Sequence, residues 1–115
     1  MGAAVISVVF NSDGSWILVG DSAGNLTRFK VADGSNLGAH NVGTAAPAAV
    51  TLSPDDTTAY VPGPRSVLVF RIADWAPLPS LRGHTDLVKR LALSSDGKRL
   101  ASASADLTVR LYCLP

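Results

Sequence analysis

The chain has 115 residues, with ten basic and nine acidic side chains and a formal net charge of +1. This balance by itself indicates neither a nucleic-acid nor a membrane partner. No apolar run reaches transmembrane length, and the amino-terminal residues lack the pattern of a signal peptide. The single cysteine, Cys113, cannot form an internal disulfide, which suits a reducing compartment. We therefore expect an intracellular protein, cytoplasmic or nuclear.

All nine acidic residues are aspartate, and the chain contains neither glutamate nor glutamine. Those longer side chains usually populate exposed helix faces, whereas aspartate favours turns because its short carboxylate can bond nearby backbone amides. Ten glycines and seven prolines add turn signals between stretches rich in Val, Leu, Ile, Ala, Ser and Thr. The composition therefore predicts an all-β fold with frequent turns.

In chain order, alternating apolar residues first predict strands at 5–10, 16–20 and 26–31, with a short outer strand at 36–40. The next group is predicted at 48–52, 58–61 and 66–72, with an outer strand at 78–82. Its second turn is Pro62-Gly63-Pro64, and we expect both prolines outside the paired strands because proline cannot donate a ladder hydrogen bond. The last predicted strands run through Lys89, Leu91 and Leu93, then 100–104 and 108–114.

These three groups are copies of one pattern. The stretches FNSDGSWILVGDSAGNLTRF, LSPDDTTAYVPGPRSVLVF and LSSDGKRLASASADLTVRLY can be aligned, and the register is kept at both ends of the unit. Successive equivalent residues are 41 or 42 positions apart, which lies within the roughly 40–45 residues of a propeller blade. The two equivalent sets are Asp13, Asp55 and Asp96, and then Phe29, Phe70 and Tyr112.

The last copy carries Gly83-His84, then Asp106 twenty-two residues after the histidine, then Tyr112 six residues later. This spacing resembles one blade of a WD-repeat β-propeller. The resemblance implies an all-β single domain over residues 1–115, made of about three four-stranded antiparallel blades. The approximate blades are 4–40, 46–82 and 88–115, and the last lacks its outer strand. Closed propellers typically have four to eight blades, so this chain predicts an incomplete ring.

Two assemblies would cover the apolar faces that an isolated fan of three blades exposes. The chain is either a portion of a longer propeller or one half of a self-assembled, dimeric ring of two three-blade copies. We favour the first of these readings.

The resemblance also assigns roles inside the last blade. It implies a hydrogen-bonded structural network of His84, Ser102, Asp106 and Tyr112, in which Tyr112 replaces the usual Trp. Linking these groups satisfies polar atoms that are costly to bury alone. A serine, a histidine and an aspartate are also the parts of a hydrolytic triad, but no G-x-S-x-G sequence accompanies them. We therefore expect no enzyme.

Recognition in the resembled family commonly uses the face near the central channel. This implies a partner-binding set in the last copy, namely Thr85, Asp86, Leu87, Lys89, Ala105 and Leu107, with matching positions at Ala4, Ile6, Ala46 and Ala48. No metal-ligand spacing and no phosphate-binding glycine loop is present, so we expect neither metal nor cofactor. The implied function is a non-enzymatic protein–protein interaction scaffold in a multiprotein assembly, with other proteins or peptides as partners.

A different class of function remains open. Six of the ten basic residues fall in the last 34 positions, interleaved with aspartates: Arg82, Lys89, Arg90, Lys98, Arg99 and Arg110. Such a surface could contact phosphates, so an RNA-associated subunit of a ribonucleoprotein complex is the alternative to a protein scaffold.

Overall fold

The computed structural model describes residues 5–41 and 50–114, with only the backbone of Val5 and Ile6. Within these ranges the regular secondary structure consists of β-strands, as the composition predicts. The described residues include no helix that could cross a membrane. The strands are β1 (Val5–Phe10), β2 (Trp16–Asp21), β3 (Asn25–Lys30), β4 (Asn36–Asn41), β5 (Thr51–Leu52), β6 (Thr58–Pro62), β7 (Ser66–Arg71), β8 (Pro77–Arg82), β9 (Val88–Leu93), β10 (Arg99–Ser104) and β11 (Val109–Cys113).

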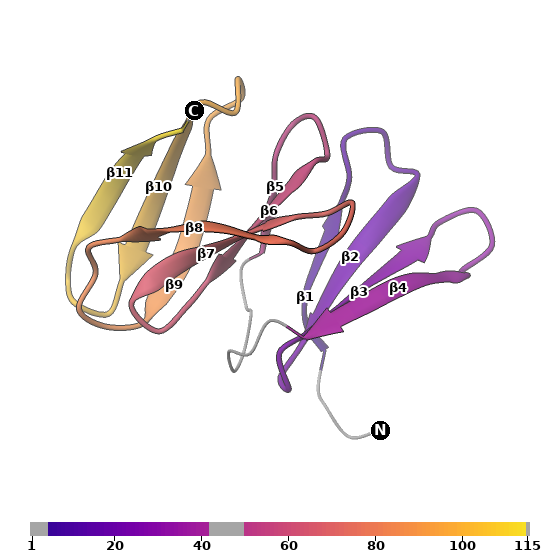
Figure 1. Ribbon diagram of the computed structural model, residues 1–115, viewed down its shortest axis with the longest axis horizontal. Helices are drawn as coiled ribbons and strands as arrows, with labels where there is room; N and C mark the ends of the chain where they lie inside the picture. The colour runs from indigo at the N-terminus through magenta and orange to yellow at the C-terminus, as the bar shows by residue number, and fades with distance from the viewer. Residues whose placement is uncertain (1–4, 42–49, 115) are drawn as a thin grey trace.

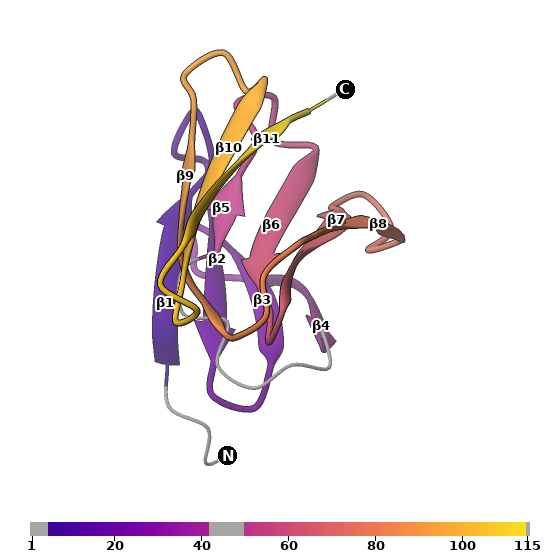
Figure 2. The same ribbon diagram turned by 90° about the vertical axis from the view of Figure 1, so that its left-hand side faces the viewer.

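The strands form three antiparallel sheets that open like a fan (Figure 1). Their orders are β1-β2-β3-β4, β5-β6-β7-β8 and β9-β10-β11, so each sheet is a meander of consecutive strands. Figure 2 looks onto the fan from the side of the β9–β11 sheet. Among the described residues this third sheet lacks the fourth strand that completes the other two, which confirms the predicted architecture.

The expectation that both prolines of Pro62-Gly63-Pro64 lie outside the strands is wrong for Pro62. It is the last residue of β6 and is paired with Val67 of β7. The N–H of Gly63 then donates to the carbonyl of Ser66 over 2.9 Å, so the hairpin continues beyond the proline. A strand end tolerates proline because few ladder bonds depend on its missing donor.

One turn geometry repeats between the first two strands of every sheet. An aspartate carboxylate accepts the backbone N–H of the residue two positions later, which fixes the turn without help from other segments. Hydrogen bonds from serine hydroxyls and from these amides hold the pKa of all three carboxyls below the usual value. The pairs are Asp13 with Ser15 at 2.9 Å, Asp55 with Thr57 at 3.1 Å, and Asp96 with Lys98 at 2.9 Å.

The middle sheet is buried on both faces because successive β6 side chains point in opposite directions. Ala59 and Val61 join Leu18 and Leu26 in an apolar cluster against the first sheet. Tyr60 points the other way, into a second cluster against the third sheet. The other members are Val50, Phe70 and Ile72 in the first cluster, and Val67, Val69, Val88 and Leu100 in the second.

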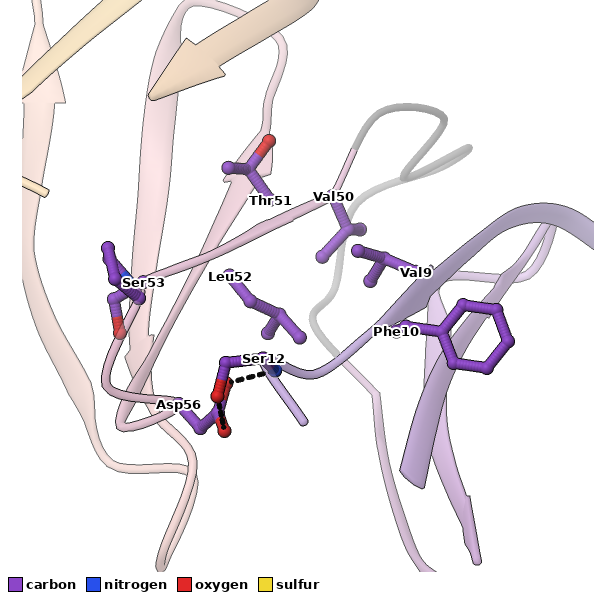
Figure 3. A pocket seen from close by; sticks show the side chains of 9 residues that line it. Val9, Phe10, Ser12, Val50, Thr51, Leu52, Ser53 and Asp56 are labelled. Atoms are coloured by element: carbon purple, nitrogen blue, oxygen red, sulfur yellow. Dashed lines mark hydrogen bonds between the residues drawn. The ribbon is translucent and has the colours of Figure 1, made fainter. Parts of the chain in front are cut away.

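Polar contacts reinforce the junction between the first and second sheets. The carboxylate of Asp56 accepts from the N–H of Ser12 at 2.9 Å, the hydroxyl of Ser12 at 2.7 Å and the side-chain amide of Asn11 at 3.2 Å. Figure 3 shows the Ser12 contacts at the edge of a shallow cleft of about 240 Å³, lined also by Val9, Phe10 and Leu52. Asp56 has φ 63°, a left-handed conformation that aspartate adopts more readily than most residues.

Aromatic rings join the outer parts of the same two sheets. His40 of β4 stacks on Trp75, in the β7–β8 turn, with ring centroids 5.4 Å apart and an interplanar angle of 2°. Phe70 of β7 meets the His40 ring edge-on at 5.6 Å. Such pairs stabilise beyond the apolar area that they bury. Trp75 therefore packs between sheets and is not presented as an open aromatic platform.

Truncation of Leu18 should separate core packing from surface contacts. Leu18 is almost fully buried between the first two sheets, so Leu18→Ala is expected to lower the free energy of unfolding by about 2–5 kcal/mol. Leu37→Ala on the outer strand β4, where the side chain is exposed, should change it by less than about 1 kcal/mol. Urea denaturation of both variants checks this difference, and equal losses would contradict the assignment of the core.

Candidate functional site

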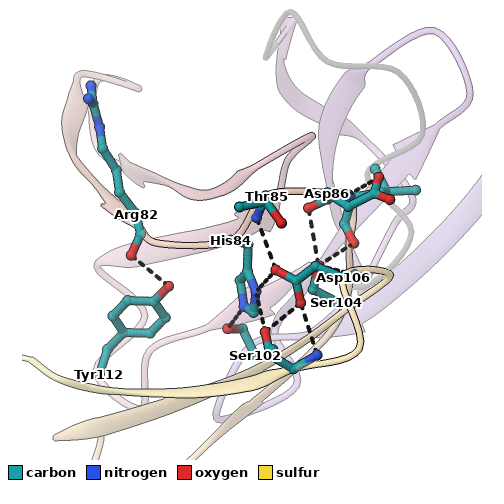
Figure 4. Close-up of polar contacts among 10 residues, drawn as sticks. Arg82, His84, Thr85, Asp86, Ser102, Ser104, Asp106 and Tyr112 are labelled. Atoms are coloured by element: carbon teal, nitrogen blue, oxygen red, sulfur yellow. Dashed lines mark hydrogen bonds and ion pairs between the residues drawn. The ribbon is translucent and has the colours of Figure 1, made fainter.

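Three polar side chains from separate elements of the third sheet meet inside it (Figure 4). His84 precedes β9, Ser102 lies in the middle of β10, and Asp106 lies in the turn between β10 and β11. Nδ1 of His84 lies 2.9 Å from a carboxylate oxygen of Asp106, and its Nε2 lies 2.6 Å from Oγ of Ser102. The structure therefore brings together three of the four residues of the expected network.

The chemistry of the groups fixes the direction of these hydrogen bonds. An ionised carboxylate can only accept, so Nδ1 of His84 carries the proton and donates to Asp106. Nε2 of the same ring then accepts from the hydroxyl of Ser102. Both His84 and Ser102 are buried, and each polar atom that points into this site has a partner. Such linkage removes the cost of burying the imidazole and hydroxyl separately.

Asp106 is the residue that holds the surrounding backbone. Besides His84, its carboxylate accepts the N–H of Thr85 at 2.9 Å, the N–H of Thr108 at 2.9 Å and the hydroxyl of Thr108. The hydrogen bond from the Thr108 hydroxyl is the main cause that lowers the pKa of Asp106 far below its usual range, with smaller effects from Thr85 and His84. The carboxylate therefore stays ionised and ties the loop before β9 to the turn before β11.

Ser104 ties the same two segments from the other side. Its Oγ lies 3.1 Å from the carbonyl oxygen of Asp86 and 3.0 Å from that of Leu87, and it accepts the N–H of Asp106. The N–H of Ala105 also donates to the carbonyl of Leu87 over 2.8 Å. The loop at 84–87 and the turn at 104–108 therefore form one hydrogen-bonded unit.

Tyr112 does not join the network, which differs from the expectation for this residue. Its hydroxyl donates to the backbone carbonyl of Arg82 over 3.0 Å and makes no hydrogen bond to Ser102 (Figure 4). The reason is register: Tyr112 is paired with Leu100, two residues along β10 from Ser102. Its ring packs against the second apolar cluster, and its hydroxyl reaches the end of β8.

The first sheet closes its equivalent turn differently. Ala23 stands where the third sheet has Asp106, and Asp21, two residues earlier, accepts the N–H groups of Ala23 and Asn25, both at 3.0 Å. Sequence reasoning missed Asp21, as it missed Thr108. The signal for Thr108 is an Asp-x-Thr step, because threonine two positions after aspartate can donate from both its amide and its hydroxyl.

The order Ser102, His84, Asp106 is that of a hydrolytic triad, but access to the serine argues against such chemistry. Ser102 is only 1% exposed, and its hydroxyl is engaged by His84 inside the sheet. An acyl-transfer nucleophile must reach a substrate carbon and needs donors placed for the resulting oxyanion. The burial of the hydroxyl and its bond to a buried imidazole suit a structural role for these residues.

The residues expected to bind a partner lie around the unit formed by the loop and the turn. Thr85, Asp86 and Leu87 are exposed in the loop, and Lys89 is exposed near the start of β9. Ala105 and Leu107 lie in the turn, where Ala105 is half-buried. Of the matching positions in the other copies, Ala4, Ala46 and Ala48 lie outside the described residues, as does the side chain of Ile6.

Leu107 is the most unusual of these residues. It is 96% exposed and has φ 72°, a left-handed conformation that is costly for a leucine. The equivalent turn position in the first sheet is Gly24, whose φ is 86°. A strained, exposed apolar residue where glycine would fit better is a feature found at functional sites.

Comparison with known proteins gives a family match for the last copy. The family model of the WD40 repeat, described as "WD domain, G-beta repeat", matches residues 75–113. The intraflagellar transport protein 122 homologs of Xenopus tropicalis and Homo sapiens are 38% and 36% identical to this chain over 63 residues. These alignments cover 55% of this chain but 5% of each relative, so the chain spans a small part of their length.

Solved structures share the fold over almost the whole chain. The structures titled "Structure of U3-55K" and "Crystal structure of RRP9 WD40 repeats" each match with a TM-score of 0.87 and 19% sequence identity. Each match covers 98% of this chain and 37% or 36% of the other. The three sheets are therefore blades of the β-propeller type. Residues 75–113 match the WD40 repeat model, and the chain has the fold of WD-repeat propellers, proteins that generally act as interaction scaffolds.

Loss of the Asp106 charge should weaken the third sheet in a pH-dependent way. The folded state lowers the pKa of Asp106 below its ordinary value of 3.8, so its contribution is present above about pH 4 and is lost as the pH falls towards the lowered value. Asp106→Asn is therefore expected to lower Tm by about 5 °C or more at pH 7. In circular-dichroism melts, the difference in Tm between Asp106→Asn and the parent chain should become smaller below pH 4.

Asp86→Asn is the matched control, because Asp86 lies in the same loop and, among the described residues, its exposed carboxylate accepts from the N–H of Leu87 alone. It should leave Tm nearly unchanged at every pH. Equal melting temperatures for the parent chain and Asp106→Asn at pH 7 would show that the network does not stabilise the fold.

Proposed function

We propose that this chain is a non-enzymatic scaffold that binds a protein partner through the exposed rim of its third sheet. The observation that carries this proposal is the strained, 96% exposed Leu107, whose turn is tied to the loop of Leu87 by the hydrogen bonds of Asp106 and Ser104. Exposed apolar residues on a rigid frame are suited to a partner because little conformational entropy is lost when they bind. We place this activity inside the cell, in the cytoplasm or nucleus.

The rest of the expected set gives this rim its polar border. Asp86 and Lys89 carry opposite charges on either side of Leu87, and both are exposed. A small apolar centre with a charged border is the arrangement typical of protein interfaces. Leu87 and Leu107 are therefore the proposed anchors, and Thr85, Asp86, Lys89 and Ala105 supply the surroundings.

Substitution of the two leucines tests the proposed interface. A photo-crosslinking amino acid at residue 107 of the full chain should capture a discrete partner in cells, which mass spectrometry identifies. The purified partner should then bind Leu87→Asp and Leu107→Asp at least about tenfold more weakly than the parent chain, because each places a charge at an apolar contact.

Val31→Asp is the matched control, since Val31 is also exposed but follows β3 in the first sheet. It should bind the partner like the parent chain. Equal binding by all four proteins would overturn the assignment of the rim.

A second candidate function, self-assembly, is favoured by the two end faces of the fan. Val8 and Phe10 of β1 alternate with Val9, which packs against the first apolar cluster, and they are 58% and 61% exposed. The third sheet presents Val109 and Leu111 on its outer side, and Leu111 is 64% exposed. Apolar faces of this kind mark interfaces. The first sheet of one copy could therefore pack on the third sheet of another, and two copies would give a ring of six blades.

The mass in solution tests self-assembly directly. Light scattering of the full chain should give twice the chain mass of 11.9 kDa for a ring of two copies. Phe10→Asp and Leu111→Asp should each shift the population to single chains, whereas Leu107→Asp should not, because Leu107 lies in the turn between β10 and β11 and on neither sheet face. A parent chain that remains a single copy at all concentrations would exclude this candidate.

A further inference from the structure

A pocket of about 300 Å³ lies where the end of β8 meets the start of β7. Its lining residues are Arg65, Ser66, Ser80, Arg82, Gly83 and His84. Ser66 and Arg82 are paired across the two strands, so Arg65 and Arg82 lie at the same end of the sheet. The lining includes two guanidinium groups and two hydroxyls, and it includes no acidic residue.

A third arginine is not part of the pocket lining but lies against Gly83, one of the lining residues. The guanidinium of Arg110, from β11, packs on Gly83, where a Cβ atom would come within 2.5 Å of Cζ of Arg110. Gly83 also has φ 132°, a conformation that side chains rarely adopt. Glycine at this position therefore lets a cation from the third sheet approach the backbone beside Arg82.

These three guanidinium groups have no carboxylate partner among the described residues. The described ion pairs join Arg71 to Asp74 and His84 to Asp106. Asp106 is bonded to His84 of the pocket lining, and its carboxylate oxygens already accept from His84, Thr85 and Thr108. Two unpaired guanidinium groups in the pocket lining, with a third beside Gly83, make this end of the sheet positive, and such a local field attracts a multiply charged anion.

The end of β8 is also fixed in position. The hydroxyl of Tyr112 donates to the carbonyl of Arg82, and His84, two residues later, is fixed by Ser102 and Asp106. The backbone that carries Arg82 and Gly83 is therefore held on both sides. A binding site on a fixed backbone loses less entropy when it is occupied than one on a free loop.

We propose that this pocket binds the phosphate group of a phosphorylated serine or threonine in a partner protein. A phosphate monoester carries close to two negative charges and accepts paired hydrogen bonds from guanidinium groups, and arginine clusters are a recurring means of recognising it. Arg65 and Arg82 contact the phosphate oxygens, and the hydroxyls of Ser66 and Ser80 add neutral donors. Arg110 contributes positive charge from its position beside Gly83.

The form of the site favours a phosphorylated peptide over RNA. Single-stranded RNA is usually held along an extended basic groove with aromatic rings on which bases stack. Here Arg65 and Arg82 line one compact pocket, and this lining contains no phenylalanine, tyrosine or tryptophan. The inference rests on the proposed function in that the phosphate belongs to a bound protein, but it uses a surface separate from Leu87 and Leu107.

The test uses the full chain and a defined probe, a Gly-Ala peptide with one central phosphoserine, followed by NMR spectra of the 15N-labelled protein. Amide signals of Ser66, Ser80 and Gly83 should shift with the phosphorylated peptide and not with its unphosphorylated form. Arg65→Ala and Arg82→Ala should weaken binding about tenfold or more. Arg90→Ala, which removes an exposed arginine on the outer side of β9, should bind like the parent chain.

Arg82→Lys tests whether binding needs the planar shape of the guanidinium as well as its charge. It keeps the positive charge but loses the planar fork, so it should bind the phosphopeptide more weakly than the parent chain. Circular-dichroism melts of each variant confirm folding, which is expected because Arg65 and Arg82 are exposed. Inorganic phosphate should displace the peptide from the same residues.

Three results would overturn the proposal: equal shifts with both peptides, equal affinity for Arg82→Ala and the parent chain, or tighter binding of a uridine octanucleotide to the same residues. The last result would assign the pocket to RNA. The proposed scaffold function is judged separately by Leu107→Asp. Partner binding that depends on Leu107 but not on Arg82 would leave the scaffold standing and refute the phosphate site.

Discussion

A hydrogen bond from a backbone amide to an aspartate carboxylate two residues earlier is the interaction on which this fold depends. It closes the first hairpin of every sheet, and in other turns it recurs at Asp21, Asp33, Asp74 and Asp106. The bond is local, because a short carboxylate reaches the amide of its own turn whereas a longer acidic side chain would not fit that geometry. Seven of the nine aspartates make this bond, so the turn geometry accounts for much of the use of aspartate in place of glutamate.

In the third sheet the aspartate of such a turn also binds a second connection. Asp106 closes its own turn through Thr108 and also accepts from His84 and Thr85, which belong to a different connection. The buried imidazole thus separates two surfaces. Leu87 and Leu107 lie on the side of the turn, and Arg82 and Gly83 lie on the side of β8. One polar network therefore supports both an apolar rim and a basic pocket, each with its own chemistry.

Much of the fold could be predicted from sequence because its signals are local. Alternating apolar residues and the spacing of Asp13, Asp55 and Asp96 predicted the strands, and the resemblance predicted the meeting of His84, Ser102 and Asp106. The contacts of Tyr112, Asp56 and Arg110 could not be predicted in this way. Each joins segments far apart in the chain, and its geometry depends on register and on how neighbouring sheets pack. The pocket beside Gly83 depends on such contacts, so no local pattern indicated it.

The agreement between chain order and spatial order has a consequence for how the protein is made. Each sheet pairs only consecutive strands, so its hydrogen bonds close short loops and cost little chain entropy. The strand pairing of one sheet therefore does not require residues of the next sheet to have been synthesised. The apolar face of a sheet is covered only when its neighbour packs on it. We therefore expect docking of the first and second sheets, to which the contacts of Asp56 with Ser12 belong, to follow pairing within each sheet.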